Sequence, residues 1–317
     1  MIEVQNVSKR YGQHVALDNV SFTIKDGEVL GFLGPNGAGK STMMNIITGY
    51  ISATDGNVKV DGVDILESPE EAKKKIGYLP ELPPLYMDMT VEEYLLFVSK
   101  IKKVPSDNIE KSLKRIMNVT KITDVRGRLI KNLSKGYKQR VGLAQSIIGN
   151  PKVLVLDEPT VGLDPKQIIE IRNLIKELGK QHTIILSSHI LPEVSAVCDR
   201  VLIINKGKIV ASGTPDELSK KLSYSNNLML RIKGRAHDIL NALKKLENIE
   251  KIKEQGVREP GTVDVLVEAK KGVDIRESLF RLMSASGLPI LMMKSMDLSL
   301  EEVFLQVTTQ EEGGNVK

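Results

Sequence analysis

The order of apolar and polar residues predicts alternating strands and helices over residues 1 to about 220. Short apolar runs at 29–33, 153–156 and 183–186 have the length and composition of buried strands. Glycine or polar residues follow each run, and longer segments with helical spacing separate them. Buried strands that alternate with helices indicate an α/β fold built on a mainly parallel sheet.

Two local signals predict individual elements within this region. Residues 57–65 alternate in character and contain Asp61-Gly62, a pair typical of a tight β-hairpin. Thr90 and Glu93 have the spacing of a capping box, which predicts a helix from there to about Lys100. The residues from Lys100 to Gly149 are mostly helical by pattern.

The pattern changes at about Ser223. Residues 228–232, 249–252, 263–267 and 289–294 have strand character, whereas 239–246 and 275–283 have helical spacing. This order, strand-helix-strand-strand-helix-strand, is typical of a ferredoxin-like α+β domain, and one more helix is expected around 300–307. We therefore predict two domains, 1–222 and 223–317, joined by a polar linker near 221–227.

Composition narrows the classes of protein further. The chain has 317 residues, a net charge of +5 spread along its length, and one cysteine, Cys198. A weak positive charge does not by itself indicate nucleic acid, and a single cysteine excludes an intrachain disulfide framework. We see no secretory signal, and the apolar runs are too short to cross a bilayer. If the protein works at a membrane, we expect another chain to do the spanning.

Gly34 to Ser41 match the phosphate-binding P-loop at all its fixed positions, between an apolar strand and a helix. Glycines let backbone N–H groups surround phosphates, and the helix N-terminus favours anions. Lys40 is expected on the β- and γ-phosphates and Ser41 on magnesium. A chance glycine-rich turn is the alternative, and the strand–loop–helix setting argues against it. The predicted nucleotide-binding residues here are Gly34, Pro35, Asn36, Gly37, Ala38, Gly39, Lys40, Ser41 and Thr42.

The apolar run at 153–156 ends in two carboxylates, Asp157 and Glu158. Strand ends in parallel sheets bring side chains to the ligand crevice. Asp157 can hold magnesium, directly or through water, and Glu158 can orient and deprotonate an attacking water. An exposed acidic turn is the alternative, but the P-loop upstream favours the catalytic interpretation.

Further motifs, in order, resemble those of the ATP-binding subunits of ABC transporters. Leu133-Ser134-Lys135-Gly136-Tyr137-Lys138-Gln139-Arg140 resembles the signature, Gly162-Leu163-Asp164 the D-loop, Ser187-Ser188-His189 the switch-histidine segment, Gly77-Tyr78-Leu79-Pro80-Glu81 the Q-loop, and Tyr11 the adenine-stacking aromatic. The resemblance covers residues 1 to about 220. It implies a mainly parallel sheet core, an antiparallel β subdomain and a helical subdomain.

The resemblance also implies a head-to-tail dimer in which each ATP lies between the P-loop of one subunit and the signature of the other. Ser134 and Gly136 would bind the γ-phosphate in trans, and Asp164 would complete the nucleotide site. His189 would hydrogen-bond the γ-phosphate as a catalytic residue, and Glu81 would meet nucleotide and magnesium. The implied cofactors are ATP and Mg²⁺, and the implied partners are a second copy and a membrane permease. The implied location is the inner face of the cell membrane.

Four positions depart from the commonest family pattern. Glu81 replaces the glutamine of the Q-loop, Lys135 and Tyr137 replace signature residues, and Val161 replaces the usual serine before the D-loop. None of these changes affects Lys40, Asp157 or Glu158, so the prediction of ATP hydrolysis stands. With the C-terminal module and the 298–304 segment, the chain resembles a subgroup of stand-alone ATPase subunits that serve separately encoded permeases, mostly in bacterial export.

Two other functions remain to be weighed against a transport ATPase. A soluble ABC ATPase acting on ribosomes or DNA usually carries two ATPase domains or long insertions, whereas this chain has one P-loop. A subunit that only binds ATP is disfavoured by the intact carboxylate pair. No nucleic acid partner is expected. His14, His182 and His237 show no metal-ligand spacing, and we interpret them as surface or structural residues.

Overall fold

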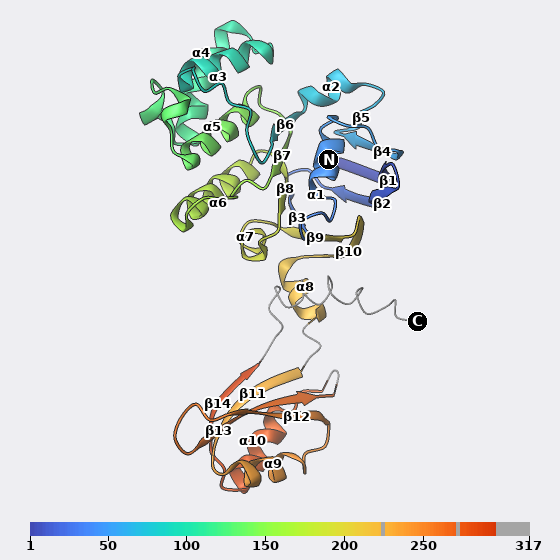
Figure 1. The fold of residues 1–317 in the computed structure, drawn as a ribbon, viewed down its shortest axis with the longest axis vertical. Helices are drawn as coiled ribbons and strands as arrows, with labels where there is room; N and C mark the ends of the chain where they lie inside the picture. Colours follow the sequence, from blue (N-terminus) through green and yellow to red (C-terminus); the bar gives the residue numbers. More distant parts are fainter. Residues whose placement is uncertain (223–225, 271–272, 296–317) are drawn as a thin grey trace. The chain divides into compact units, whose positions relative to one another are not determined.

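The computed structural model describes residues 1–222, 226–270 and 273–295, and the chain divides into two compact units, Met1–Pro215 and Asp216–Lys317 (Figure 1). The first unit is α/β, and the second is α+β. Within the described residues, no helix combines the length and the apolar character needed to cross a membrane.

A six-stranded sheet forms the centre of the first unit, in the order β10-β9-β3-β8-β7-β6. Its strands are β3 (Val29–Leu33), β6 (Ile76–Leu79), β7 (Val153–Asp157), β8 (Thr183–Ser188), β9 (Arg200–Asn205) and β10 (Lys208–Gly213). All neighbours are parallel except β10 and β9. Every residue of β3, β7 and β8 is buried, as expected for runs without polar alternation. The prediction of a mainly parallel sheet is confirmed.

An antiparallel sheet with the order β2-β1-β4-β5 forms a second layer. Its strands are β1 (Ile2–Tyr11), β2 (His14–Ile24), β4 (Asp55–Val60) and β5 (Val63–Asp64). Asp61 and Gly62 make the predicted hairpin turn, with φ of 50° and 76°. Helix α1 (Lys40–Ile47) contacts both sheets. Its buried residues therefore join the two layers in one core.

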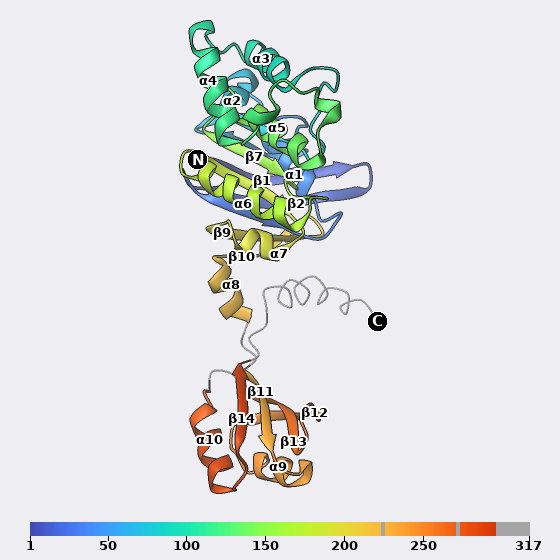
Figure 2. The ribbon, with the colours of Figure 1, turned by 90° about the vertical axis from the view of Figure 1, so that its left-hand side faces the viewer.

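Helices α3 (Val91–Ile101), α4 (Ser106–Val119) and α5 (Lys135–Ile147) form the helical subdomain, grouped at one end of the unit (Figure 2). The capping box before α3 is confirmed, because the Thr90 N–H donates to Glu93 Oε2 and the Glu93 N–H donates to Thr90 Oγ1. Lys102 follows α3 and donates to three carbonyl groups, those of Gln145, Ser146 and Ile148. Lys102 thus ties the end of α3 to the end of α5. The remaining helices of the unit are α2 (Pro69–Lys74), α6 (Pro165–Gly179) and α7 (Leu191–Ser195).

The second unit contains the strand-helix-strand-strand-helix-strand order predicted from sequence. Its elements are α8 (Pro215–Leu222), β11 (Asn226–Lys233), α9 (Ala236–Leu243), β12 (Ile249–Gly256), β13 (Thr262–Ala269), α10 (Arg276–Ala285) and β14 (Ile290–Ser295). The four strands are antiparallel in the order β12-β13-β11-β14, which is ferredoxin-like. Alternate residues of β11 and β13 pack with α9 and α10 in its core. The helix expected around 300–307 lies outside the described residues.

Candidate nucleotide-binding site

The P-loop, residues 34–41, connects β3 to the start of α1. Gly39 has φ of 107°, and a Cβ atom there would lie 2.6 Å from the carbonyl oxygen of Ala16 in β2. Gly37 also has positive φ, at 79°. The loop therefore needs glycine both for its backbone conformation and for its close approach to β2. This is the physical reason for the glycine spacing in the motif.

A cavity of about 440 Å³ opens beside the P-loop. It brings together residues from β1, the P-loop, the segments after β6 and β7, and the segment after β8. Ten predicted site residues line it: Tyr11, Asn36, Gly37, Gly39, Lys40, Ser41, Thr42, Glu81, Glu158 and His189. His14, Ala16 and Val161 also line it. These three residues were not predicted to belong to the nucleotide site. His14 lies three positions after Tyr11, across the turn between β1 and β2, and this short separation was a signal for its position.

Glu158 lies between two basic groups in this cavity. Its Oε1 is 3.4 Å from the Lys40 ammonium, and its Oε2 is 2.9 Å from Nδ1 of His189. Lys40 is buried and also donates to the carbonyl oxygens of Gly34 and Pro35, at 2.8 and 3.2 Å. A cation held by its own loop, next to a carboxylate and facing a cavity, suits the binding of phosphates and the activation of a water.

Asp157, at the end of β7, accepts two hydroxyl hydrogen bonds on the same oxygen. Ser187 Oγ donates to Asp157 Oδ1 at 2.5 Å, and Ser41 Oγ donates to it at 3.4 Å. Burial raises the pKa of Asp157 above its usual range, although the two serine hydrogen bonds oppose that shift. Hydroxyl and carboxylate oxygens beside a phosphate-binding loop are the ligand type that Mg²⁺ prefers. The residues present therefore fit a magnesium ion.

Ser187 belongs to the Ser187-Ser188-His189 motif, but the sequence did not predict it as a site residue. Its Oγ also accepts the backbone N–H of Glu158, at 2.9 Å. No local sequence signal predicts this contact, because it depends on β7 and β8 being parallel neighbours in a register that pairs Asp157 with Ser187.

Seven predicted residues are not among those that line the cavity: Gly34, Pro35 and Ala38 of the P-loop, Asp157 at the end of β7, and Ser134, Gly136 and Asp164. Ser134 is the N-cap of α5, where its hydroxyl accepts the Tyr137 N–H at 3.4 Å. Asp164 is the N-cap of α6, where Oδ1 accepts the Gln167 N–H at 2.9 Å. Gly136 lies so close to Gln167 that a Cβ would be 2.6 Å from its side-chain carbon. Within one subunit, the signature and the D-loop are therefore neighbours of each other.

The two unusual signature residues have different environments. The Lys135 ammonium lies against Gly162, where a Cβ atom would be only 2.0 Å away. The Tyr137 hydroxyl donates to Asp124 at 2.7 Å, and this hydrogen bond raises the pKa of Tyr137. The phenol is thus bound within the helical subdomain, whereas Lys135 extends to the D-loop.

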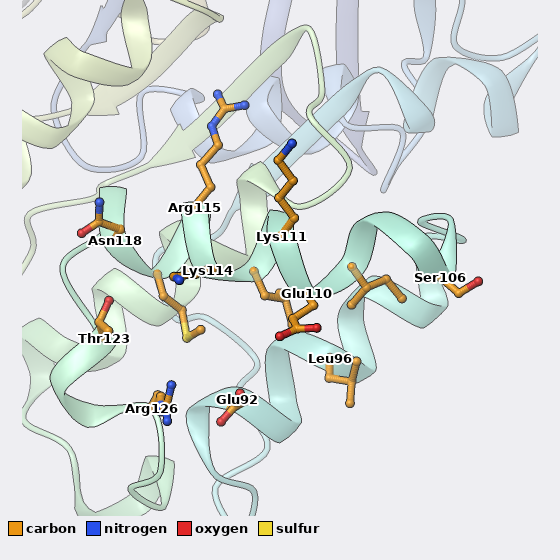
Figure 3. Close-up of a pocket in the computed structure, with 13 residues that line it drawn as sticks. Glu92, Leu96, Ser106, Glu110, Lys111, Lys114, Arg115, Asn118, Thr123 and Arg126 are labelled. Carbon is orange, nitrogen blue, oxygen red and sulfur yellow. The ribbon is translucent and has the colours of Figure 1, made fainter.

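A larger cavity, of about 990 Å³, lies along α3 and α4 (Figure 3). Lys111 and Arg115 point to one side of α4, and Glu92 and Leu96 of α3 lie on the other. Acidic and basic side chains are mixed on its walls, and none of the predicted site residues lines it. The size of a cavity does not therefore locate the nucleotide site in this protein.

A P-loop between a strand and a helix, with a carboxylate pair ending a parallel strand of the same sheet, is the arrangement of a P-loop ATPase. The comparisons with known proteins define the family within that class. The model of the family described as ABC transporter matches residues 17–161. The chain belongs to the ABC transporter family.

Relatives extend this assignment over the rest of the chain. The linearmycin resistance ATP-binding protein LnrL of Bacillus subtilis is 30% identical over 309 residues, which are 97% of this chain and 98% of that protein. The bacitracin transport ATP-binding protein BcrA of Bacillus licheniformis is 35% identical over 223 residues, 70% of this chain and 72% of BcrA. The similarity to LnrL therefore includes the second unit.

A solved dimeric structure of the ATP-binding cassette MJ0796, in a post-hydrolysis state with ADP and Pi, has a TM-score of 0.62 and 27% identity. It covers 68% of this chain and 98% of the cassette. This chain is accordingly an ATP-binding and ATP-hydrolysing subunit of an ABC transporter. Such subunits power transport by ATP-driven dimerisation and act with membrane permeases.

Proposed function

We propose that this chain is the ATPase of an export system for antibiotic-like compounds. It works as a homodimer with Mg²⁺·ATP, on the cytoplasmic face of the membrane, beside a separately encoded permease. Support for export comes from the relatives, which are described as linearmycin resistance and bacitracin transport proteins. Support for the dimer comes from the dimeric cassette.

The proposed ATP site follows the cavity beside the P-loop. Residues 34–42 surround the phosphates, with the Lys40 charge on the β- and γ-phosphates. Tyr11 is half exposed at the end of β1 and lines the same cavity, where its ring can stack on adenine. We divide the chain into an ATPase domain, 1–222, and an accessory domain, 223–317, which takes no part in this chemistry.

Ser41, Asp157 and Glu81 are the residues that would hold magnesium. Ser41 and Asp157 are already in hydrogen-bond contact, and Glu81 lines the same cavity. When bound, the ion neutralises charge on the phosphate oxygens. A carboxylate at position 81 adds a negative charge that the usual glutamine lacks, and it strengthens this site for a divalent cation.

Glu158 is the proposed general base, and its position between Lys40 and His189 is the observation that carries the proposal. In this role Glu158 accepts the proton of the attacking water, while His189 aligns that water and hydrogen-bonds the γ-phosphate. Ser134, Gly136 and Asp164 complete the site of the other subunit. These three residues do not line the nucleotide cavity of their own chain, which supports a role at the cavity of the partner subunit.

The test is the variant Glu158→Gln. We expect it to bind ATP and accumulate as an ATP-bound dimer, with turnover lower by about 10²–10⁴. Size-exclusion chromatography with light scattering, in ATP and in ADP, measures the dimer. Glu110→Gln, at an exposed position of α4, is the matched control. Normal turnover by Glu158→Gln would show that another group is the base.

A third cavity, of about 700 Å³, is proposed as the docking groove of the permease. It lies between α1, β6 and the helical subdomain, and its walls include Tyr50 and Leu82, each 78% exposed. Contiguous exposed apolar surface, such as the two side chains form on the wall of one cavity, marks interaction sites. Substitution of both by Glu should abolish co-purification with a polytopic membrane protein without changing ATP affinity. Co-purification of the unchanged chain with ribosomes or DNA instead would favour the alternative function.

A further inference from the structure

Ser187 occupies the last part of β8, next to the carboxylate-bearing end of β7. It is fully buried. Its hydroxyl donates to Asp157 Oδ1 at 2.5 Å and accepts the backbone N–H of Glu158 at 2.9 Å. One hydroxyl therefore contacts both residues of the carboxylate pair, one through its side chain and the other through its backbone.

We propose that Ser187 is a positioning residue for ATP hydrolysis, which fixes the carboxylate of Asp157 and the backbone of Glu158 relative to each other. This inference rests on the roles proposed above for those two residues. A serine hydroxyl has a single proton. That proton is donated to Asp157, which fixes the orientation of the hydroxyl. The fixed orientation leaves a lone pair directed at the N–H of Glu158.

The Glu158 backbone gives this hydrogen bond its importance. Glu158 has φ of 47°, in the left-handed region that residues other than glycine, asparagine and aspartate rarely adopt. Such a conformation persists only when surrounding contacts impose it. Two hydrogen bonds hold the Glu158 backbone in this conformation. Its N–H donates to the Ser187 hydroxyl, and its carbonyl oxygen accepts the Val161 N–H at 3.2 Å. The side chain that meets Lys40 and His189 is aimed by this backbone.

The next residue along β8 provides a matched comparison. Ser188 is equally buried, and its hydroxyl also accepts a backbone N–H, that of Ile190, at 3.0 Å. Among the hydrogen bonds of the described residues, Ser188 Oγ has none with Asp157 or Glu158. The two serines thus share strand, burial and the acceptance of a backbone N–H, and they differ in contact with the carboxylate pair.

The experiment compares Ser187→Ala with Ser188→Ala, with Ser187→Thr as the variant that keeps the hydroxyl. Steady-state ATPase kinetics give kcat and KM, and a fluorescent ATP analogue measures affinity in Mg²⁺ and in EDTA. We expect Ser187→Ala to lose about 10–100-fold in kcat and most of the affinity gained from Mg²⁺. Its affinity in EDTA should stay within about twofold, since the P-loop still holds the phosphates. Ser188→Ala should lose much less kcat than Ser187→Ala and keep the affinity gained from Mg²⁺, and Ser187→Thr should recover most of the activity.

Glu158→Gln, measured in parallel, separates failure of this inference from failure of the proposed function. Equal kinetics for the two alanine variants would overturn the positioning role while leaving the site intact if Glu158→Gln is inactive. Normal turnover by Glu158→Gln would instead overturn the proposed function. If Ser187→Ala loses ATP affinity in EDTA and thermal stability together, and Ser187→Thr does not recover activity, Ser187 is a structural residue and the inference is wrong.

Discussion

Each unit of this protein buries an aspartate in a sheet, and the two aspartates differ in their hydrogen-bond partners and in the direction of their pKa shifts. Asp264 of β13 is 2% exposed and accepts two hydrogen bonds from Arg231, at 2.7 and 2.9 Å. Asp157 of β7 is 4% exposed and accepts only serine hydroxyls among the described side chains. The arginine lowers the pKa of Asp264, whereas burial raises the pKa of Asp157.

The difference separates a structural charge from a functional one. Arg231 neutralises Asp264 within the second unit, so the pair needs no ligand. In the first unit Asp157 forms no ion pair with the described residues, and its partner Ser41 lines the cavity of about 440 Å³. Shifted pKa values cluster at functional sites, and the hydrogen bond to Ser41 of the P-loop places Asp157 at such a site.

Among the variants compared here, the largest loss of turnover should follow removal of the Lys40 ammonium in the first unit. Lys40→Ala deletes the charge that meets the phosphates and leaves Glu158 with His189 alone. We expect ATP turnover to fall by about 10²-fold or more. Arg231→Met, in the second unit, is the control, and it should keep turnover within about twofold. Unchanged turnover and ATP affinity in Lys40→Ala would remove the P-loop assignment.

A smaller effect is expected from Tyr11→Ala, which removes the proposed adenine platform. Stacking of a base on an aromatic ring contributes about 1–3 kcal/mol, so ADP and ATP should both bind more weakly, by about 5- to 150-fold. The loss should be the same for both nucleotides, because the ring meets the base. Titration with a fluorescent ADP analogue measures it. If ATP alone were affected, Tyr11 would have to act near the γ-phosphate.

The two aspartates predict stability changes of opposite sign. The folded-state pKa of Asp264 is lowered, so its stabilisation is present above the unfolded pKa and is lost as pH falls through the folded value. The folded-state pKa of Asp157 is raised, so its ionised form at neutral pH costs stability. At pH 7, without nucleotide or Mg²⁺, Asp264→Asn should lower the unfolding temperature of the second unit by several degrees.

Asp157→Asn should instead raise the unfolding temperature of the first unit slightly, although turnover falls. Calorimetry at pH 7 and at about pH 3 measures both changes, and the Asp264→Asn difference should shrink at the lower pH, which lies below the unfolded pKa of about 3.9. A decrease in the unfolding temperature by both variants at pH 7 would show that Asp157 is as well compensated as Asp264, and the contrast between the units would disappear.

The smallest effect on nucleotide binding should come from deletion of the whole second unit. Every residue that lines the nucleotide cavity lies between Tyr11 and His189. A chain that ends near Lys221 should therefore bind ATP within about twofold of the full chain, with altered dimerisation or coupling to the permease. Equilibrium titration of the soluble truncation tests this. A folded truncation that cannot bind ATP would mean that residues after 221 reach the site.

The sequence predicts the elements whose signals are local. The P-loop, the Asp61-Gly62 hairpin and the Thr90 capping box each depend on residues a few positions apart, and each can be recognised from spacing alone. The βαββαβ order of the second unit follows from the same periodicities. These features are also the ones for which backbone conformation and residue type are directly linked.

Contacts between distant parts of the chain could not be predicted in this way. Ser187 meets Asp157 across 30 residues because β7 and β8 pair in one particular register. The bond from Tyr137 to Asp124 and the contact of Lys135 with Gly162 depend on how the helical subdomain packs. The left-handed backbone of Glu158 has no local signal either, since glutamate is a poor residue for it.

That backbone conformation has an evolutionary consequence. Local energetics favour glycine or asparagine at position 158, so glutamate persists there only under selection for its carboxylate. In a lineage that no longer hydrolyses ATP, we expect Glu158 to be replaced early by genetic drift. The carboxylate is then no longer needed, and replacement by glycine or asparagine relieves the backbone strain at this position. Glycine or asparagine at the corresponding position of a related subunit would then identify a pseudoenzyme before any assay is made.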